Sequence, residues 1–121
     1  MPLQLGTGKK GLGMFFKDWQ VEALRCLWGI QPEGANSRVV WENVNESPKG
    51  PISRASIINF LNEMVDEELL NFTETTGKGG HHRVYYIKYG ETEFIEHIAS
   101  LIISKLLKEY PQGTRKTIQQ V

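Results

Sequence analysis

Hydrophobic residues recur with helical spacing in three segments of the first half of the chain. The first segment is predicted to begin near residue 17 or 18, with Asp18 as its N-cap, and to end at Gly29. Ser37 is expected to cap a second, shorter helix, and Ser53 a third that runs to about Glu68. The apolar positions are Val21, Leu24, Leu27 and Trp28 in the first, Val39, Val40, Trp41 and Val44 in the second, and Ile57, Phe60, Leu61, Met64 and Val65 in the third. Three amphipathic helices are therefore expected to share a core.

After the third helix the pattern changes to one that is typical of strands. Residues 69–75 form one predicted strand, and residues 83–89, which are rich in aromatic and β-branched side chains, form a second. The sequence Gly77-Lys78-Gly79-Gly80 between them predicts a tight turn and hence a β-hairpin, to which residues 50–52 could add a third edge. Beyond Gly90, a long helix is expected over residues 92–110, followed by a polar tail.

This order of elements predicts an α+β fold that is mainly α, in which three helices and a β-hairpin wing form a winged helix-turn-helix. We expect a flexible, glycine-rich arm over residues 1–16, the winged-helix DNA-binding domain over residues 17–90, a C-terminal dimerisation helix over residues 91–110 and a flexible tail over residues 111–121. The chain of 121 residues is long enough for one such domain and too short for two ordinary ones.

Composition narrows the class of protein. A hydrophobic fraction of 40% and a charged fraction of 23% are typical of a soluble globular protein. No apolar run is long enough to span a membrane, and the residues after Met1 are polar and glycine-rich rather than a signal core, so we expect a cytoplasmic protein with no membrane contact. Cys26, the single cysteine, lies in an apolar helical pattern and is interpreted as a buried structural thiol. The alternative, a redox switch, would lack a second thiol to resolve it.

Four stretches of the sequence carry a resemblance to a known family. They are Glu22-Ala23-Leu24-Arg25-Cys26-Leu27-Trp28, Ser53-Arg54-Ala55-Ser56-Ile57, Met64-Val65-Asp66-Glu67-Glu68-Leu69-Leu70 and Arg83-Val84-Tyr85-Tyr86. Over residues 19–107, most of the chain, the sequence resembles the winged-helix repressors of the penicillinase-repressor type and, more loosely, the MarR and PadR regulators. The resemblance implies a dimeric transcription regulator. Two features depart from it: Glu67-Glu68 stands where the family usually has Lys-Gly before the wing, and the family's protease-sensing segment cannot be identified.

In a helix-turn-helix, the third helix enters the major groove and its first residues meet base edges. With the apolar stripe of that helix buried, the outward side chains are expected to be those of Ser53, Arg54, Ala55, Ser56, Ile58, Asn59 and Asn62. Arg54 would pair with guanine O6 and N7, and Asn59 with adenine N6 and N7. The alternatives are that Ser53 is only a helix cap and that Asn59 is only a solvated surface residue. The absence of acidic residues between residues 47 and 62 favours DNA.

The predicted turn of the hairpin also offers cations to DNA, namely Lys78, His81, His82 and Arg83. Such a tip can lie along a phosphate backbone or insert a cation into the minor groove, and a solvated hairpin tip is the alternative. The net charge of zero, from 14 basic and 14 acidic residues, counts against a nucleic-acid binder. The charge is polarised, however: the first 17 residues hold three lysines and no acid, and the far end of the third helix carries Glu63, Asp66, Glu67 and Glu68. We therefore expect modest DNA affinity with a shallow salt dependence.

The last predicted helix is apolar on more of its circumference than one partner can cover. One side is expected to pack on its own domain, and the other on a second copy of the chain through Phe94, Ile98, Leu101, Ile102 and Leu106. An isologous homodimer would place two third helices about one turn of DNA apart, over a palindromic operator. The alternative is a compact monomer that buries the whole helix.

The predicted function is therefore a sequence-specific, DNA-binding transcription regulator, a repressor whose effector is an unidentified small molecule or protein. A winged-helix module for protein–protein contact without base readout is the alternative, which the basic wing and arm disfavour. We expect no enzymatic activity, because no catalytic pattern of nucleophile, acid and base stands out. No metal or cofactor is expected, since His81 and His82 would point to opposite faces of a strand, and Cys26 and His97 complete no ligand set.

Overall fold

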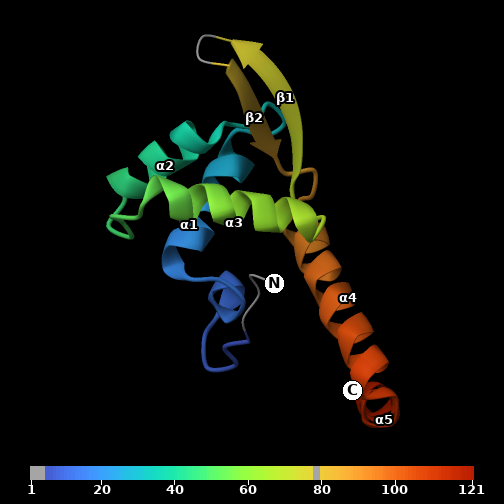
Figure 1. Ribbon diagram of the computed structural model, residues 1–121. Coiled ribbons are helices and arrows are strands. Elements are labelled where there is room, and N and C mark those ends of the chain that lie inside the picture. The colour runs from blue at the N-terminus through green and yellow to red at the C-terminus, as the bar shows by residue number, and fades with distance from the viewer. Residues whose placement is uncertain (1–4, 78–79) are drawn as a thin grey trace. The chain divides into compact units, whose positions relative to one another are not determined.

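The structure, a computed structural model, describes residues 5–77 and 80–121 and divides into two compact units, Met1–Lys88 and Tyr89–Val121. Over the described residues it is an α+β protein, mainly helical, with one two-stranded antiparallel sheet (Figure 1). The first unit contains η1 (Gly11–Met14), α1 (Asp18–Gly29), α2 (Ser37–Glu46), α3 (Arg54–Asp66), β1 (Asn71–Gly77) and β2 (Gly80–Tyr86). The second contains α4 (Glu91–Glu109) and α5 (Pro111–Gln120). The predicted α+β class is therefore confirmed.

The three helices of the first unit bury the apolar stripes that their spacing predicts. The buried residues include Ala23, Leu24 and Leu27 in α1, Val40 and Val44 in α2, and Ile57, Phe60, Leu61 and Met64 in α3. α2 packs against both α1 and α3. Removing a side chain of this size from water contributes about 1.5–3 kcal/mol. The helices thus hold one another in place and leave their polar faces to solvent.

The starts of α2 and α3 are set by polar side chains. The Ser53 hydroxyl oxygen accepts a hydrogen bond from the Ser56 N–H at 3.1 Å, which confirms the predicted cap. The cap of α2 is Asn36 rather than the predicted Ser37, and its Oδ1 accepts from the Val39 N–H at 2.9 Å. Asparagine and serine cap helices about equally well, so the sequence pattern alone does not choose between these neighbours.

The hairpin begins later, and its second strand earlier, than the sequence predicts. Leu69 and Leu70 are apolar like strand residues, but both are buried in the turn that follows α3. Their N–H groups donate to the Met64 carbonyl at 2.9 and 3.2 Å. Glu68, which precedes them, has a φ of 61° and so lies in the left-handed region, where glycine usually ends a helix. The turn that follows α3 therefore includes Leu70, and strand pairing starts directly after it, at the first residue of β1.

The hairpin has a third edge, but not at residues 50–52 as predicted. There the Asn45 side chain binds the backbone of Ile52, with Oδ1 accepting from the N–H at 2.8 Å, and residues 50–52 form no strand. The third edge is Ala35, whose N–H donates to the Tyr85 carbonyl at 2.9 Å and whose carbonyl accepts from the Tyr85 N–H at 2.8 Å. Gly34, with a φ of 80°, permits this approach, because a Cβ on it would collide with the Tyr85 carbonyl oxygen.

The segment before α1 contains a helix where the sequence predicts a flexible arm. η1 is followed by Phe16, whose ring packs edge-to-face on Phe60 with centroids 6.0 Å apart, and Leu12 is also buried. The N-cap of α1 is Lys17 rather than the predicted Asp18, and the Lys17 N–H donates to Oε1 of the glutamine three residues later at 2.8 Å. Because glycines are frequent in this segment, the sequence pattern does not reveal that Leu12 and Phe16 are buried.

The second unit also contains a helix that the sequence does not predict. α5 begins with Pro111 in its first turn, a position that suits proline because the N–H would be unpaired there. The Thr114 hydroxyl donates to the Leu106 carbonyl at 3.1 Å, so the expected polar tail packs as a helix on the end of α4. None of the described helices is long and apolar enough to cross a membrane.

We predict that Gly34→Ala lowers the free energy of unfolding by about 2–4 kcal/mol, because it adds backbone strain and a clash with Tyr85. Chemical denaturation followed by circular dichroism measures the loss. Gly29→Ala is the matched control, because Gly29 is exposed, an added Cβ there meets no atom within 4 Å, and alanine is the better helix residue. Equal effects of the two substitutions would contradict the role given to Gly34.

Candidate nucleic-acid interface

The side chains on the outward face of α3 differ in whether they make hydrogen bonds within the chain. Arg54, Ala55 and Asn59 are exposed. Ser53 is exposed too, but its hydroxyl oxygen accepts the capping hydrogen bond and lies 2.8 Å from the Ser56 hydroxyl. The two serines therefore stabilise the start of the helix, which is the alternative that the sequence left open for Ser53. The side chains of Arg54, Ala55 and Asn59 remain available to another molecule.

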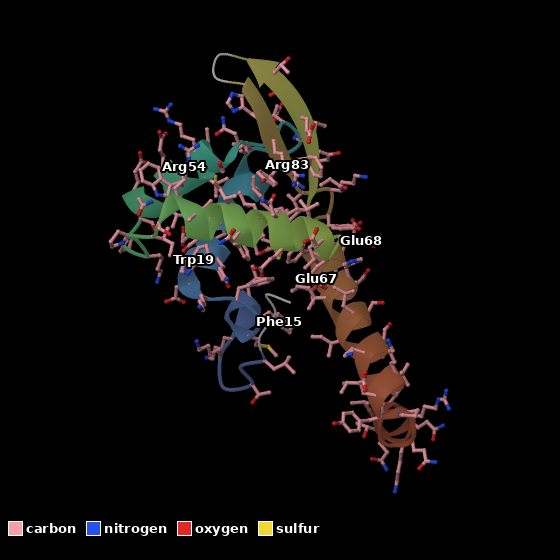
Figure 2. All side chains as sticks on the ribbon, in the orientation of Figure 1. Phe15, Trp19, Arg54, Glu67, Glu68 and Arg83 are labelled. Atoms are coloured by element: carbon pink, nitrogen blue, oxygen red, sulfur yellow. The ribbon has the colours of Figure 1, made fainter. Side chains whose placement is uncertain are left out.

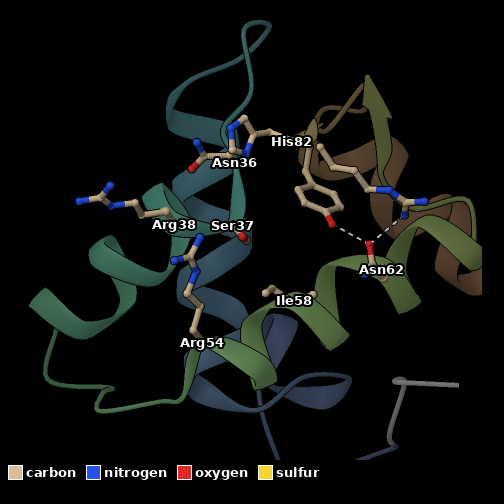
Figure 3. A pocket seen from close by; sticks show the side chains of 9 residues that line it. Asn36, Ser37, Arg38, Arg54, Ile58, Asn62 and His82 are labelled. Atoms are coloured by element: carbon tan, nitrogen blue, oxygen red, sulfur yellow. Dashed lines mark hydrogen bonds between the residues drawn. The ribbon is translucent and has the colours of Figure 1, made fainter. Parts of the chain in front are cut away.

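Two of the predicted DNA-contact residues, Asn62 and Arg83, bind each other. Asn62 Oδ1 accepts hydrogen bonds from the Tyr85 hydroxyl at 2.6 Å and from Arg83 Nη1 at 3.0 Å (Figure 3). The Arg83 guanidinium also lies 4.0 Å from the Phe72 ring centre, and its Nε is 4.0 Å from a carboxylate oxygen of Glu74. These contacts fix the hairpin to α3. They could not be predicted from the spacing of residues in the sequence, because they join side chains that are distant along the chain. Asn62 and Arg83 thus hold the hairpin against α3, and their predicted contact with DNA stays a prediction.

Tyr85 connects this network to the rest of the first unit. Its backbone pairs with Ala35, its hydroxyl binds Asn62, and it is 3% exposed. Burial raises the pKa of the hydroxyl above its ordinary value of 10.0, and the positive charge of Arg83 offsets part of the rise. The phenol is therefore held in its protonated form, in which it can donate to Asn62.

A pocket of about 550 Å³ opens where α2, α3 and β2 meet (Figure 3). Its polar lining includes Asn36, Ser37 and Arg38 at the start of α2, Arg54 in α3, and His82 and Arg83 in β2. Ile58, predicted to touch a thymine methyl group, is half-buried and lines the same pocket. The residues of α2 could not be predicted as part of this pocket, because no spacing in the sequence relates them to α3. An N-cap followed two residues later by an arginine is the local signal that points to them.

The positive charge of this pocket is unfavourable for the helices that carry it. Arg38 and Arg54 lie in the first turns of α2 and α3, and neither of these turns holds an acidic residue. A helix N-terminus carries a partial positive charge, so a cation there is disfavoured by about 0.3–1 kcal/mol. Arg38 Nε lies 3.0 Å from Glu42 Oε1, but both side chains are exposed and such a pair contributes little. The start of α2 with Arg38, together with Arg54 from the first turn of α3, thus contributes positive potential to one pocket, which favours an anion.

The other end of α3 carries the opposite charge. Glu63, Asp66, Glu67 and Glu68 lie at or just beyond its C-terminus, and Figure 2 shows Arg54 and the last two glutamates at opposite ends of the helix. The helix dipole favours acids at the N-terminus and cations at the C-terminus. The polarity of α3 is the reverse of this arrangement, so its charges do not serve its own stability. These charges are better explained by a role of the exposed side chains of α3 in binding another molecule.

The remaining polar candidates are described in part. Lys78 and the side chain of His81 lie outside the described residues, and His82 is exposed beside the pocket. Within the described part of the chain, no three His, Cys, Asp or Glu side chains are grouped so that they could hold a metal ion. Cys26 is half-buried, and burial raises the pKa of its thiol, which keeps it in the less reactive protonated form.

In α4, the predicted dimer-contact residues fall into two groups. Phe94 and Ile98 are buried. They are four residues apart and so lie on one side of the helix. Leu101 and Ile102 are half-buried. The exposed large apolar side chains of α4 are Ile95, Ile103 and Leu106.

Comparisons of the chain with protein-family models, with curated proteins and with solved structures found no match. The resemblance to the winged-helix repressors therefore stays a prediction that rests on the motifs quoted above. A function for the chain has to be inferred from the charge, exposure and contacts of its own residues.

We predict that Arg54→Glu raises the free energy of unfolding by up to about 1 kcal/mol at low salt, because the first turn of α3 favours a negative charge. Added salt should reduce the gain, since mobile ions screen exposed charges. Urea denaturation at two ionic strengths measures both effects. Arg25→Glu makes the same charge change in the second half of α1, where it should lower stability instead. The same sign of effect at both positions would refute this account of the charge on α3.

We predict a loss of stability above about pH 10, where exposed phenols begin to ionise. Because the pKa of Tyr85 is raised in the folded state, its contribution is complete below the unfolded pKa and is lost as the pH rises through the folded pKa. Tyr85→Phe should flatten this alkaline loss, whereas Tyr110→Phe, at a ring that is 69% exposed, should not. Urea denaturation from neutral to alkaline pH measures the slopes. A slope unchanged by Tyr85→Phe would exclude the buried phenol as its source.

Proposed function

We propose that the protein is a winged helix-turn-helix regulator of transcription, which binds double-stranded DNA as a homodimer and represses by covering a promoter. The observation that carries the proposal is the charge of α3, which runs against the dipole of the helix and brings an exposed Arg54 to a pocket with three arginines. A positive surface built at a cost to its own helices needs an anionic partner. The phosphate backbone of DNA is an extended partner of this kind.

The order of elements supports the winged-helix assignment. Three helices are followed by a hairpin, and Ala35 adds a third edge along β2. In this assignment α3 is the recognition helix, since the major groove is wide enough to admit an α-helix. Arg54 then meets guanine O6 and N7, Asn59 meets adenine N6 and N7, and Ala55 contacts a thymine methyl group.

The hairpin would act as the wing of this interface. Because Asn62 and Arg83 join β2 to α3, the wing would reach the DNA at a fixed spacing from the recognition helix. His82 is exposed on the same side as the pocket and would contact a phosphate of the backbone. Contacts to the backbone would then set the register in which Arg54 and Asn59 read bases.

The surface of α4 supports the homodimer. Exposed Ile103 and Leu106, with half-buried Leu101 and Ile102, offer an apolar face to a second copy of the chain. An isologous contact would relate two copies of α3 by a twofold axis, which suits a palindromic operator. An effector that binds one spacing of the two helices better than another would release the DNA.

A second candidate function is a winged helix that binds a protein and reads no bases. The net charge of zero favours it, because DNA-binding domains usually carry a basic excess. The arginine-lined pocket disfavours it, since a protein interface has no need for cations that destabilise their own helices. Retention on heparin at low salt would distinguish the two.

Selection of bound sequences from a pool of random duplex DNA tests the proposed function. We expect enrichment of a palindrome with half-sites about one helical turn apart. Salt-sensitive binding without enrichment would exclude a sequence-specific regulator and leave a general DNA-binding role. No binding at low salt would favour the protein-binding candidate.

We predict that Arg54→Ala and Asn59→Ala each weaken binding to the selected sequence by about 1–3 kcal/mol and hardly change binding to random DNA. Fluorescence anisotropy with both kinds of duplex measures the difference. Arg25→Ala, at an exposed position of α1, is the control for the loss of one positive charge. Equal weakening on every sequence would show that Arg54 and Asn59 do not read bases.

A further inference from the structure

The pocket between α2, α3 and β2 has a chemistry that base reading by α3 does not use. We infer that it binds a single phosphoryl group, held chiefly by Arg38 and Arg54. Two sources can offer this group. One is a phosphodiester of the DNA backbone, in which case the inference rests on the proposed function, and the other is a free phosphate or phosphate monoester, in which case it does not. The volume of about 550 Å³ lies in the range of small-molecule sites and accommodates the group attached to either.

Arg54 and Arg38 supply the cations. Arg54 makes no ion pair with any described residue, and Figure 3 shows its side chain extending from α3 toward the start of α2. The Arg38–Glu42 pair joins side chains that are 69% and 47% exposed, so a phosphate can replace this carboxylate at little cost. A guanidinium presents parallel N–H donors that match two phosphate oxygens, which makes arginine the side chain best suited to this ligand.

The start of α2 adds neutral donors. The Val39 N–H is taken by Asn36 Oδ1, but the N–H groups of Ser37 and Arg38 precede it in the first turn, where a helix supplies no carbonyl acceptors. Ser37 also lines the pocket, so its hydroxyl is available there. A phosphate beside this turn would gain hydrogen bonds and the partial positive charge of a ten-residue helix, in addition to the two guanidinium groups.

The side of the pocket formed by β2 carries a fixed positive charge. Arg83 is held by Asn62, so it contributes charge without being free to move onto the ligand, and His82 is exposed beside it. Glu74 of β1 pairs with Arg83 and, like Glu42, does not line the pocket. Among the described residues, the pocket therefore has three guanidinium groups and no carboxylate in its lining, which selects an anion over a neutral ligand.

Inorganic phosphate is the probe for this site in the full chain. The protein is titrated with sodium phosphate, and with sodium chloride at the same ionic strength, while NMR follows the N–H groups of Ser37, Arg38 and the Arg54 side chain. We predict saturable shifts with phosphate and none with chloride. Arg54→Gln should weaken phosphate binding by at least about tenfold, because it removes a bidentate charged donor. Arg25→Gln, which removes the same charge outside the pocket, should change the affinity by less than about twofold.

Binding to DNA identifies the source of the phosphoryl group. Arg38 is not among the proposed base readers, so Arg38→Gln separates a phosphate contact from base reading. If the occupant is a backbone phosphodiester, Arg38→Gln weakens binding to all sequences alike and reduces the slope of log affinity against log salt by about 1. Phosphate then also competes with DNA more strongly than chloride does. If phosphate binds the pocket without such competition, the occupant is a free phosphate or monoester.

The failures of the two proposals are distinguishable. The phosphoryl site is overturned if phosphate shifts the pocket resonances no more than chloride and Arg38→Gln leaves DNA affinity unchanged, an outcome under which DNA selection can still succeed. It is also overturned if Arg25→Gln weakens phosphate binding as much as Arg54→Gln, because the attraction is then not local. Saturable phosphate binding without any DNA binding at low salt would overturn the proposed function and support the site.

Discussion

The candidate site depends on the pairing of Ala35 with Tyr85. Two backbone hydrogen bonds, of 2.9 and 2.8 Å, attach the segment before α2 to β2, and Gly34 provides the space for this approach. Asn36 follows directly as the N-cap, so the pairing also sets where α2 begins. Through its hydroxyl, the same Tyr85 reaches Asn62 on α3. One residue thereby joins the three elements that surround the pocket.

The helical core of the first unit explains why the fold tolerates cations in the first turns of α2 and α3. A cation in a first turn costs about 0.3–1 kcal/mol, whereas each buried apolar side chain of the helices contributes about 1.5–3 kcal/mol. The core of α1, α2 and α3 therefore outweighs the repulsion at Arg38 and Arg54 several times over. The cost is small enough for the fold to retain it and large enough to need a reason. The anion that we propose for the pocket would supply that reason.

Strong periodic patterns made most of the fold predictable. The stripes of α1, α2 and α3, the cap at Ser53 and the hairpin follow from the spacing of residues close in sequence. The Ala35 edge is a single pairing with no period, and Leu69 and Leu70 look like strand residues although they complete a turn. η1 is only four residues long and α5 is mostly polar, so no periodic pattern distinguishes them from loops. An element could be predicted from its own sequence wherever its apolar residues repeat with the period of a helix or a strand.

The candidate site was predictable only along α3. Its periodicity separates the exposed Arg54 and Asn59 from the buried stripe. Whether a polar side chain at the surface is free or engaged depends on residues distant in sequence, as the hydrogen bond between Asn62 and Arg83 shows. Arg38 was missed for the same reason, since only the folded chain brings it to the pocket that Arg54 lines.

The net charge of zero does not describe the surroundings of this pocket. α3 has 13 residues and so extends about 20 Å, at 1.5 Å per residue. At physiological salt, exposed charges are screened over about 8 Å, so Asp66 and the acids beyond it lie about 18 Å or more from Arg54, more than two screening lengths, whereas Glu63 lies within two. These acids contribute to the net charge of zero but are largely screened from Arg54. The proposed anion site is therefore compatible with a net charge of zero, and weak steering at long range would leave recognition to the contacts made in the pocket.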